Sequence, residues 1–173
     1  MMTFLQRCFA LFFLVLAMLQ AGSAVAGYAD DDEEDFPDKG RQEKEVAFPT
    51  FPQEGGGLEF YVGPLTANRF FIDPATLEVD PEGVVRYVLV VKSAGGAVNI
   101  TFEGIRCDTT EYRVYGIGHS DGSWVRPRAS VWRPIENKPV NRHHAALSAE
   151  YFCANGIIRN PAEGVAAIKK GRP

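Results

Sequence analysis

The chain has few cysteines and lacks the short motifs of several common sites. Its three cysteines form no C-x-x-C pair of the kind that zinc sites use. The glycine-rich stretch at residues 116–124 does not fit the phosphate-binding loop G-x-x-x-x-G-K-[ST]. The acidic run at residues 30–35 lacks the glycine turn of a calcium loop, and the spacing of Glu103, Glu111 and Asp121 selects no glycosidase-type carboxylate pair. We therefore predict no catalytic residue, no cofactor and no metal ligand.

The apolar run near the N-terminus is short. It covers about residues 8–19, whereas a membrane-spanning helix needs about 20 residues. Arg7 precedes the run, and small residues ending at Ala26 follow it. This layout predicts a signal peptide over residues 1–26, with a retained anchor as the alternative. No cysteine stands at the cleavage site after the run, so a lipid anchor is not expected. We predict a soluble periplasmic protein with no membrane span after cleavage.

Negative charge is concentrated before the predicted domain. Residues 27–57 hold ten acidic and three basic residues, whereas residues 58–173 hold twelve acidic and fourteen basic ones. The domain is therefore close to neutral, which argues against nucleic acid as a partner. The acidic run predicts a disordered tail, with cation binding or a cover for a basic surface as alternatives. The Phe-Pro pairs of residues 46–53 favour extended backbone and predict an arm docked on the domain, with glycines 55–57 as a hinge.

Residues 58–173 are predicted to form a single α+β domain. Residues 84–92 (VVRYVLVVK) are rich in β-branched residues and apolar on both faces, which predicts a covered central strand. Turns at residues 80–83 and 93–96 connect it to neighbours, so we expect a small antiparallel meander, able to curve strongly. Residues 143–153 predict one C-terminal helix packed on the sheet. The residues after it are predicted to fray.

The strand that ends at Cys107 has an interrupted pattern. Val98, Ile100 and Phe102 alternate with polar residues that end at Glu103, which predicts a half-buried strand with Glu103 outward. Gly104 interrupts the alternation, and glycine inside a strand often marks a bulge. A bulge there would place Ile105 and Cys107 on the face of Phe102. We therefore expect Cys107 to point into the core and Arg106 to face away from it.

Cys107 and Cys153 are the two cysteines left after signal cleavage. An even number of cysteines in an oxidising compartment predicts a disulfide between them. Closing this loop should stabilise the fold by about 4 kcal/mol in the chain-entropy model. The alternatives are a cysteine nucleophile, which would need a base among His119, His143 and His144, and a metal site. Neighbouring histidines on a helix diverge by about 100°, which argues against a shared ion at His143 and His144.

A basic, tryptophan-containing segment offers candidate ligand contacts. Arginine beside tryptophan can hold phosphate, carboxylate or sugar rings, which would suit an anionic envelope component such as a glycan or a lipid phosphate. The alternative is that the tryptophans fill the core and the arginines are solvated. With the arginine beside Cys107, the candidates are Arg106, Trp124, Arg126, Arg128, Trp132 and Arg133.

Four blocks in order carry a family resemblance. They are FFIDPATLEV (residues 70–79), the long stretch from GVVRY to YGIG (residues 83–118), DGSW (residues 121–124) and LSAEYFC (residues 147–153). Together they resemble the cryptic neisserial protein one-like family of exported bacterial proteins, over nearly the whole mature chain. The resemblance implies a Gram-negative envelope protein and brings no catalytic residue with it. Some relatives look like lipoproteins, and this chain departs from them because it has no lipobox cysteine. Its two cysteines match the family's RC and FC positions.

Three classes of function stay open on the sequence. The leading expectation is a non-catalytic binding or accessory module of the periplasm, acting as a monomer on an envelope protein or an anionic envelope component. The alternatives are an envelope enzyme acting on glycan or lipid and a structural, partner-bound protein. An enzyme should gather convergent polar groups in a deep pocket, whereas a binding module needs only a shallow groove or an aromatic patch.

Overall fold

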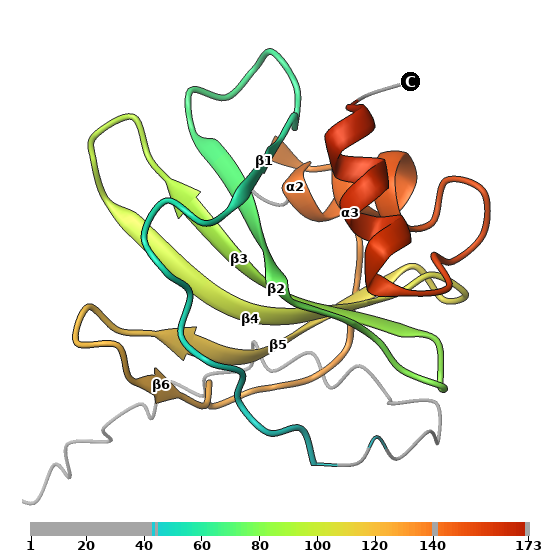
Figure 1. Ribbon diagram of the computed structural model, residues 1–173, viewed down its shortest axis with the longest axis horizontal. Coiled ribbons are helices and arrows are strands. Elements are labelled where there is room, and N and C mark those ends of the chain that lie inside the picture. Colours follow the sequence, from blue (N-terminus) through green and yellow to red (C-terminus); the bar gives the residue numbers. More distant parts are fainter. Residues whose placement is uncertain (1–42, 44, 140–141, 172–173) are drawn as a thin grey trace, which may run out of the picture. The chain divides into compact units, whose positions relative to one another are not determined.

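The computed structural model describes residue 43, residues 45–139 and residues 142–171 (Figure 1). The predicted signal peptide and the acidic run at residues 30–35 lie outside the described residues. Within the described ranges, no helix has both the length and the apolar character to cross a membrane.

An antiparallel sheet forms the centre of the described structure (Figure 1). Its strands are β1 (Leu58–Phe60), β2 (Arg69–Val79), β3 (Val84–Lys92), β4 (Val98–Arg106), β5 (Glu111–Gly118), β6 (Trp124–Val125) and β7 (Arg133–Pro134). They pair in the order β1 to β6, with β7 also on β5. Over the residues that are described, the sheet does not close. The predicted antiparallel α+β fold is confirmed.

The central strand β3 is buried on both sides, as its apolar pattern predicts. Val85, Tyr87 and Leu89 pack with the C-terminal helices, on what we call the helix face of the sheet. Val84 and Val88 pack with Phe48 of an extended N-terminal segment, on what we call the arm face. The arm comprises residue 43 and residues 45–57. Because both faces are covered, a polar residue in the middle of the sheet must find a partner on one of them.

The predicted bulge in β4 at Gly104 is wrong. β4 pairs residue by residue with β3 through Gly104, from Val98 to Arg106. Regular alternation therefore puts Phe102 in the arm-face cluster and Ile105 in the helix-face cluster. Glu103 shares the helix face and is only 3% exposed, so the prediction that it points outward is also wrong.

The irregularity lies in β5, at Tyr115. Gly116 pairs with Phe102 and Val114 pairs with Glu103, which leaves Tyr115 as the extra residue of β5. Gly104 is needed for packing beside it, because a Cβ there would lie 2.9 Å from the Tyr115 ring. A side chain at this position of β4 would displace the ring.

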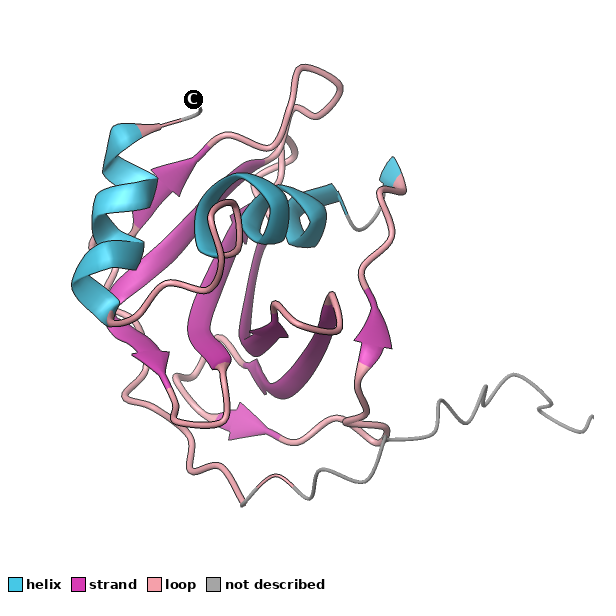
Figure 2. Ribbon diagram, turned by 90° about the vertical axis from the view of Figure 1, so that its right-hand side faces the viewer, coloured by secondary structure: helices cyan, strands magenta, loops and turns pink. Residues whose placement is uncertain are grey.

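The helices pack on one side of the curved sheet (Figure 2). α2 (Arg142–Ala146) runs directly into the π-helix η2 (Leu147–Phe152), which together account for the predicted helix, and α3 (Pro161–Lys170) follows. The expectation of a frayed end is therefore wrong for residues 161–170, and residues 172–173 lie outside the described residues. Asn160 Oδ1 accepts the Glu163 backbone N–H at 3.0 Å and Pro161 fills the first helical position, a common helix start.

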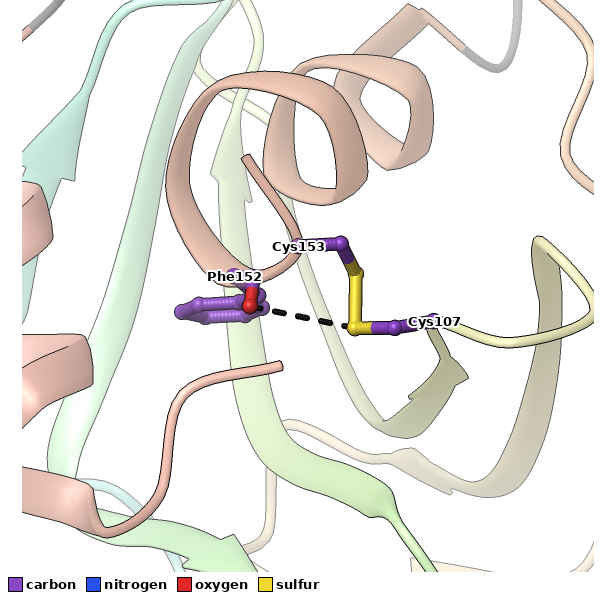
Figure 3. Close-up of a disulfide and its surroundings, with 3 residues drawn as sticks. All are labelled: Cys107, Phe152 and Cys153. Atoms are coloured by element: carbon purple, nitrogen blue, oxygen red, sulfur yellow. Dashed lines mark hydrogen bonds between the residues drawn. A yellow bond between two sulfur atoms is a disulfide. The ribbon is translucent and has the colours of Figure 1, made fainter. Parts of the chain in front are cut away.

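The predicted disulfide is present. Cys107, just after β4, joins Cys153, just after η2, with an S–S distance of 2.07 Å and a Cα–Cα distance of 5.4 Å (Figure 3). Cys107 Sγ lies 3.8 Å from the carbonyl oxygen of Phe152, and Cys153 packs against the helix-face core. The crosslink ties η2 to the sheet over a sequence separation of 46 residues.

Glycines on β5 make room for the arm. A Cβ on Gly116 would lie 2.7 Å from the Phe48 ring, and one on Gly118 would lie 2.9 Å from the Phe51 ring. Both rings also pack on Trp124, at centroid distances of 5.9 and 5.2 Å. The arm therefore lies against β5 and β6 with its aromatic side chains seated over glycine.

Candidate functional site

A buried polar cluster lies on the helix face, centred on Glu103. The Oε2 atom of Glu103 is 2.8 Å from Nε2 of His144 and accepts the Tyr87 hydroxyl at 3.3 Å. Its other oxygen, Oε1, accepts the Thr101 hydroxyl at 2.7 Å. Glu103 and His144 are 3% and 4% exposed. The carboxylate is thus fully engaged in a region from which water is largely excluded.

Aromatic rings hold the two histidines of this cluster in place. Tyr112 of β5 stacks on His144 with ring centroids 3.9 Å apart, and Phe70 of β2 stacks on His143 at 5.4 Å. The two imidazoles lie 4.0 Å apart, so the expected divergence of neighbouring histidines does not occur here. One potential ligand atom from each of Glu103, His143 and His144 lies within 4.8 Å of the others.

The cluster shifts the pKa values of its members. Burial alone would raise the pKa of Glu103, but the electrostatic attraction and hydrogen bond of His144, with contributions from His143 and Thr101, lower that pKa to about 2. Burial and the neighbouring His144 lower the pKa of His143 to about 4, against the opposing influence of Glu103. The folded protein therefore favours an ionised Glu103 and a neutral His143 at neutral pH.

Acid should destabilise the fold in two overlapping stages. His143 takes up its proton near pH 6.5 when unfolded but near pH 4 when folded, so its contribution to stability is lost as pH falls from about 6.5 to 4. The contribution of Glu103 is lost as pH falls from about 4.5 to 2. We expect the melting temperature, measured in metal-free buffer, to decrease through both windows.

The variant His143→Gln separates the two stages. This substitution should remove most of the decrease in melting temperature between pH 6.5 and 4. The decrease at more acidic pH, which is due to Glu103, should remain. A wild-type melting temperature that stays constant from pH 7 to pH 4 would contradict this account.

A second buried ionic cluster lies on the arm face, around Arg86. Arg86 donates to the carboxylates of Glu43 and Asp80, whose side chains are 2% and 10% exposed. Tyr115 donates its hydroxyl to Glu43 at 2.6 Å, and Arg113 lies 3.4 Å from the same carboxylate. Glu43 therefore attaches the arm to the sheet through a desolvated ion pair with Arg86.

The structure divides the predicted ligand contacts into three places. Arg106 lies buried beneath Trp132, with its guanidinium carbon 3.9 Å from the ring centroid. Trp124 donates its Nε1–H to the carbonyl of Pro49 at 3.0 Å, and Arg126 lies over the Phe48 ring at 4.8 Å. Arg128 and Arg133 are exposed. The six residues do not form one surface, because the arm covers Trp124 and Trp132 is buried in the core.

An apolar cavity of about 290 Å³ opens on the arm face, between the arm and strands β2 to β4. Among the described residues that line it, Glu54 and Lys92 are the charged ones. Lys92 Nζ lies 5.3 Å from the centroid of the Phe71 ring, which forms part of the wall. The other walls are made mainly by Phe51, Pro52, Val90, Val98 and Ile100.

Sequence reasoning missed this cavity although a signal was present. Val98 and Ile100 alternate on β4, and Val98 is 54% exposed, which is unusual for an apolar strand residue beside a covered sheet. The polar residues that an enzyme would gather are instead dispersed. Glu103 lies with His143 and His144 on the helix face. Arg106 lies under Trp132 on the arm face. Glu111 accepts the hydroxyl of Thr109.

Comparison with known proteins places the chain in a family. It is 26% identical over 171 residues to Cryptic neisserial protein 1 of Neisseria gonorrhoeae, an alignment that covers 83% of this chain and 84% of that protein. No solved structure matches the chain. The family model described as CNP1-like family matches residues 36–169, which include the whole sheet and nearly all of the helical region. The chain belongs to the CNP1-like family.

Proposed function

We propose that this protein is a non-catalytic binding module of the Gram-negative periplasm, and that the cavity under its arm holds one alkyl chain of an anionic amphiphile. The observation that carries the proposal is the apolar cavity of about 290 Å³ with Lys92 in its lining. This volume is at the lower end of ligand pockets, which usually begin near 300 Å³. It suits a single chain better than a two-chain lipid.

The charge of the lining indicates the headgroup. Lys92 makes no ion pair with a carboxylate among the described residues, and its Nζ lies over the Phe71 ring. Arg69 also lies over that ring, at 5.1 Å, but is already paired with Glu59 at 2.6 Å. Lys92 is therefore the cation that we assign to a phosphate or carboxylate headgroup.

The buried Glu103 cluster supports binding over catalysis. Glu103 and His144 are nearly inaccessible, and they lie on the opposite face of the sheet from the cavity. An enzyme acting on glycan or lipid would need such groups in contact with its substrate. The cavity offers mainly apolar walls, with Lys92 and Glu54 as its charged lining residues, which suit retention of an amphiphile whose headgroup lies at Lys92.

Export is part of the same proposal. The disulfide supports it, because disulfides persist in oxidising compartments such as the periplasm. The protein recovered from the periplasm should have a mass that corresponds to cleavage after Ala26. A cytoplasmic protein that keeps residues 1–26 would contradict the export proposal alone.

Calorimetric titration with two lysolipids tests the cavity. The probes are lauroyl lysophosphatidylglycerol, which is anionic, and lauroyl lysophosphatidylcholine, which is zwitterionic, both below their micelle-forming concentrations. The exposed position of Val98 allows Val98→Asp to place a carboxylate at the cavity without emptying the core. We expect it to weaken binding of the anionic probe at least tenfold, about 1.4 kcal/mol, and Lys92→Gln to weaken binding of that probe selectively.

Val125→Asp is the matched control, because Val125 is 45% exposed and lies outside the cavity. It should bind both probes as the wild type does. Absence of binding to either probe, or equal effects of the Val98 and Val125 substitutions, would contradict the proposed ligand site.

A further inference from the structure

Two imidazoles and one carboxylate meet on the helix face, away from the arm-face cavity. They belong to Glu103 in the middle of β4 and to His143 and His144 in the first turn of α2. One ligand-type atom of each residue lies within 4.8 Å of the others. Histidine nitrogen and carboxylate oxygen are the ligands that zinc and other first-row divalent ions take from proteins.

The three groups are held by a surrounding set of contacts. Thr101 donates to Oε1 of Glu103 at 2.7 Å, and Oε2, which lies 2.8 Å from His144 Nε2, also accepts the Tyr87 hydroxyl at 3.3 Å. The Tyr112 and Phe70 rings stack on His144 and His143. Outer contacts of this kind fix the orientation of metal ligands and are part of a functional metal site.

One nitrogen of the cluster is left without a protein partner. His144 Nδ1 is buried and makes no hydrogen bond to the described residues. Buried polar atoms are normally satisfied, and an unsatisfied one costs free energy. His144 is therefore held by its Nε2 contact with Glu103 and by the Tyr112 ring, and not by a hydrogen bond at Nδ1.

The site also has an open side. Glu103 and His144 are buried, whereas His143 is only partly buried. An ion could therefore reach the cluster past His143.

We propose that Glu103, His143 and His144 form a binding site for a divalent first-row transition metal ion, with zinc as the ion that this ligand set favours. The inference revises the expectation of no metal ligand, which rested on missing metal-site motifs and on the expected divergence of the neighbouring histidines. The rings instead lie 4.0 Å apart, with their planes inclined by 44°. The inference does not depend on the proposed amphiphile site, which lies on the other face.

Titration of the tag-free mature protein with Co²⁺ and Zn²⁺ tests this site. After treatment with chelator and its removal, one equivalent of Co²⁺ should produce visible d–d absorption bands, and Zn²⁺ should abolish them. Zn²⁺ should also raise the melting temperature, because it binds the folded state.

His143→Gln is the decisive variant, since His143 is partly exposed and its loss should leave the fold intact. Changes to outer-shell partners weaken metal affinity about 10–100-fold, so removal of a ligand should cost at least about 100-fold. Glu103→Gln should have the same effect where it folds. His119→Gln is the control. His119 is exposed in the turn between β5 and β6, and it is the one histidine of the chain that lies outside the proposed site.

The control variant should bind Co²⁺ with the wild-type affinity and spectrum. Absence of stoichiometric binding by the wild type would overturn the proposal. It would also be overturned if His143→Gln bound as the wild type does, or if His119→Gln abolished the bands.

Discussion

Replacement of Cys107 and Cys153 together by serine should lower the free energy of unfolding by about 4 kcal/mol. The crosslink closes a loop with a sequence separation of 46 residues, and the chain-entropy model gives about this value for such a loop. Typical domains are stable by only about 5–15 kcal/mol. The double variant should therefore lose a large share of its stability.

Urea unfolding of the oxidised wild type, the reduced wild type and the double variant measures this effect. Reduction of the wild type should produce the same loss as the substitution, and the reductant should not change the variant. A loss of less than about 1 kcal/mol would show that the disulfide forms without contributing the stability expected of a loop of this size.

Arg86→Met should be the most damaging single charge substitution on the arm face. It removes the cation between the carboxylates of Glu43 and Asp80, which are both largely buried. Loss of one partner of a buried ion pair costs about 3–5 kcal/mol, because the remaining buried charges lose their compensating cation. Glu43 keeps the Tyr115 hydroxyl and Arg113 as partners, so the loss should lie toward the lower end of this range and the attachment of the arm should weaken.

Arg69→Met is the matched control for this substitution. Arg69 also makes a short ion pair, to Glu59 at 2.6 Å, but the two side chains are 62% and 47% exposed. Exposed pairs contribute about 0–1 kcal/mol. Denaturant unfolding should therefore rank the two variants far apart, and equal losses would show that the Arg86 cluster contributes no more than a surface pair.

The parts of the fold that could be predicted are those governed by local pattern. Residues 84–92 are apolar on both faces, and such a strand is stable only between two covering layers. Two cysteines outside the predicted signal peptide, in a chain expected to be exported, leave one disulfide to form. Neither inference requires knowledge of which distant residues meet.

Glu103 shows why the buried polar cluster could not be predicted. Its place in an alternating strand suggested exposure, because a lone carboxylate is costly to bury. Burial becomes favourable mainly through His144, which is 41 positions away in the chain. Glu43 was likewise assigned with the acidic tail, because Arg86 lies 43 positions away.

The helix α3 was missed although its signals are local. Asn160, Pro161 and Glu163 form a usual helix start, which the expectation of a frayed end left unused. In the structure Gly164 is buried, and a Cβ there would lie 2.6 Å from Leu77. Its low helix propensity is offset by close packing of α3 on β2.

The proposed location of the ligand under the arm is tested most directly by methyl NMR. The wild-type protein is titrated with lauroyl lysophosphatidylglycerol, and the Val and Ile methyl signals are followed. The account predicts shifts for Val90, Val98 and Ile100, which line the cavity, and none for Ile105 and Ile168 in the helix-face core. Shifts confined to the helix-face residues, or none at saturating probe, would contradict it.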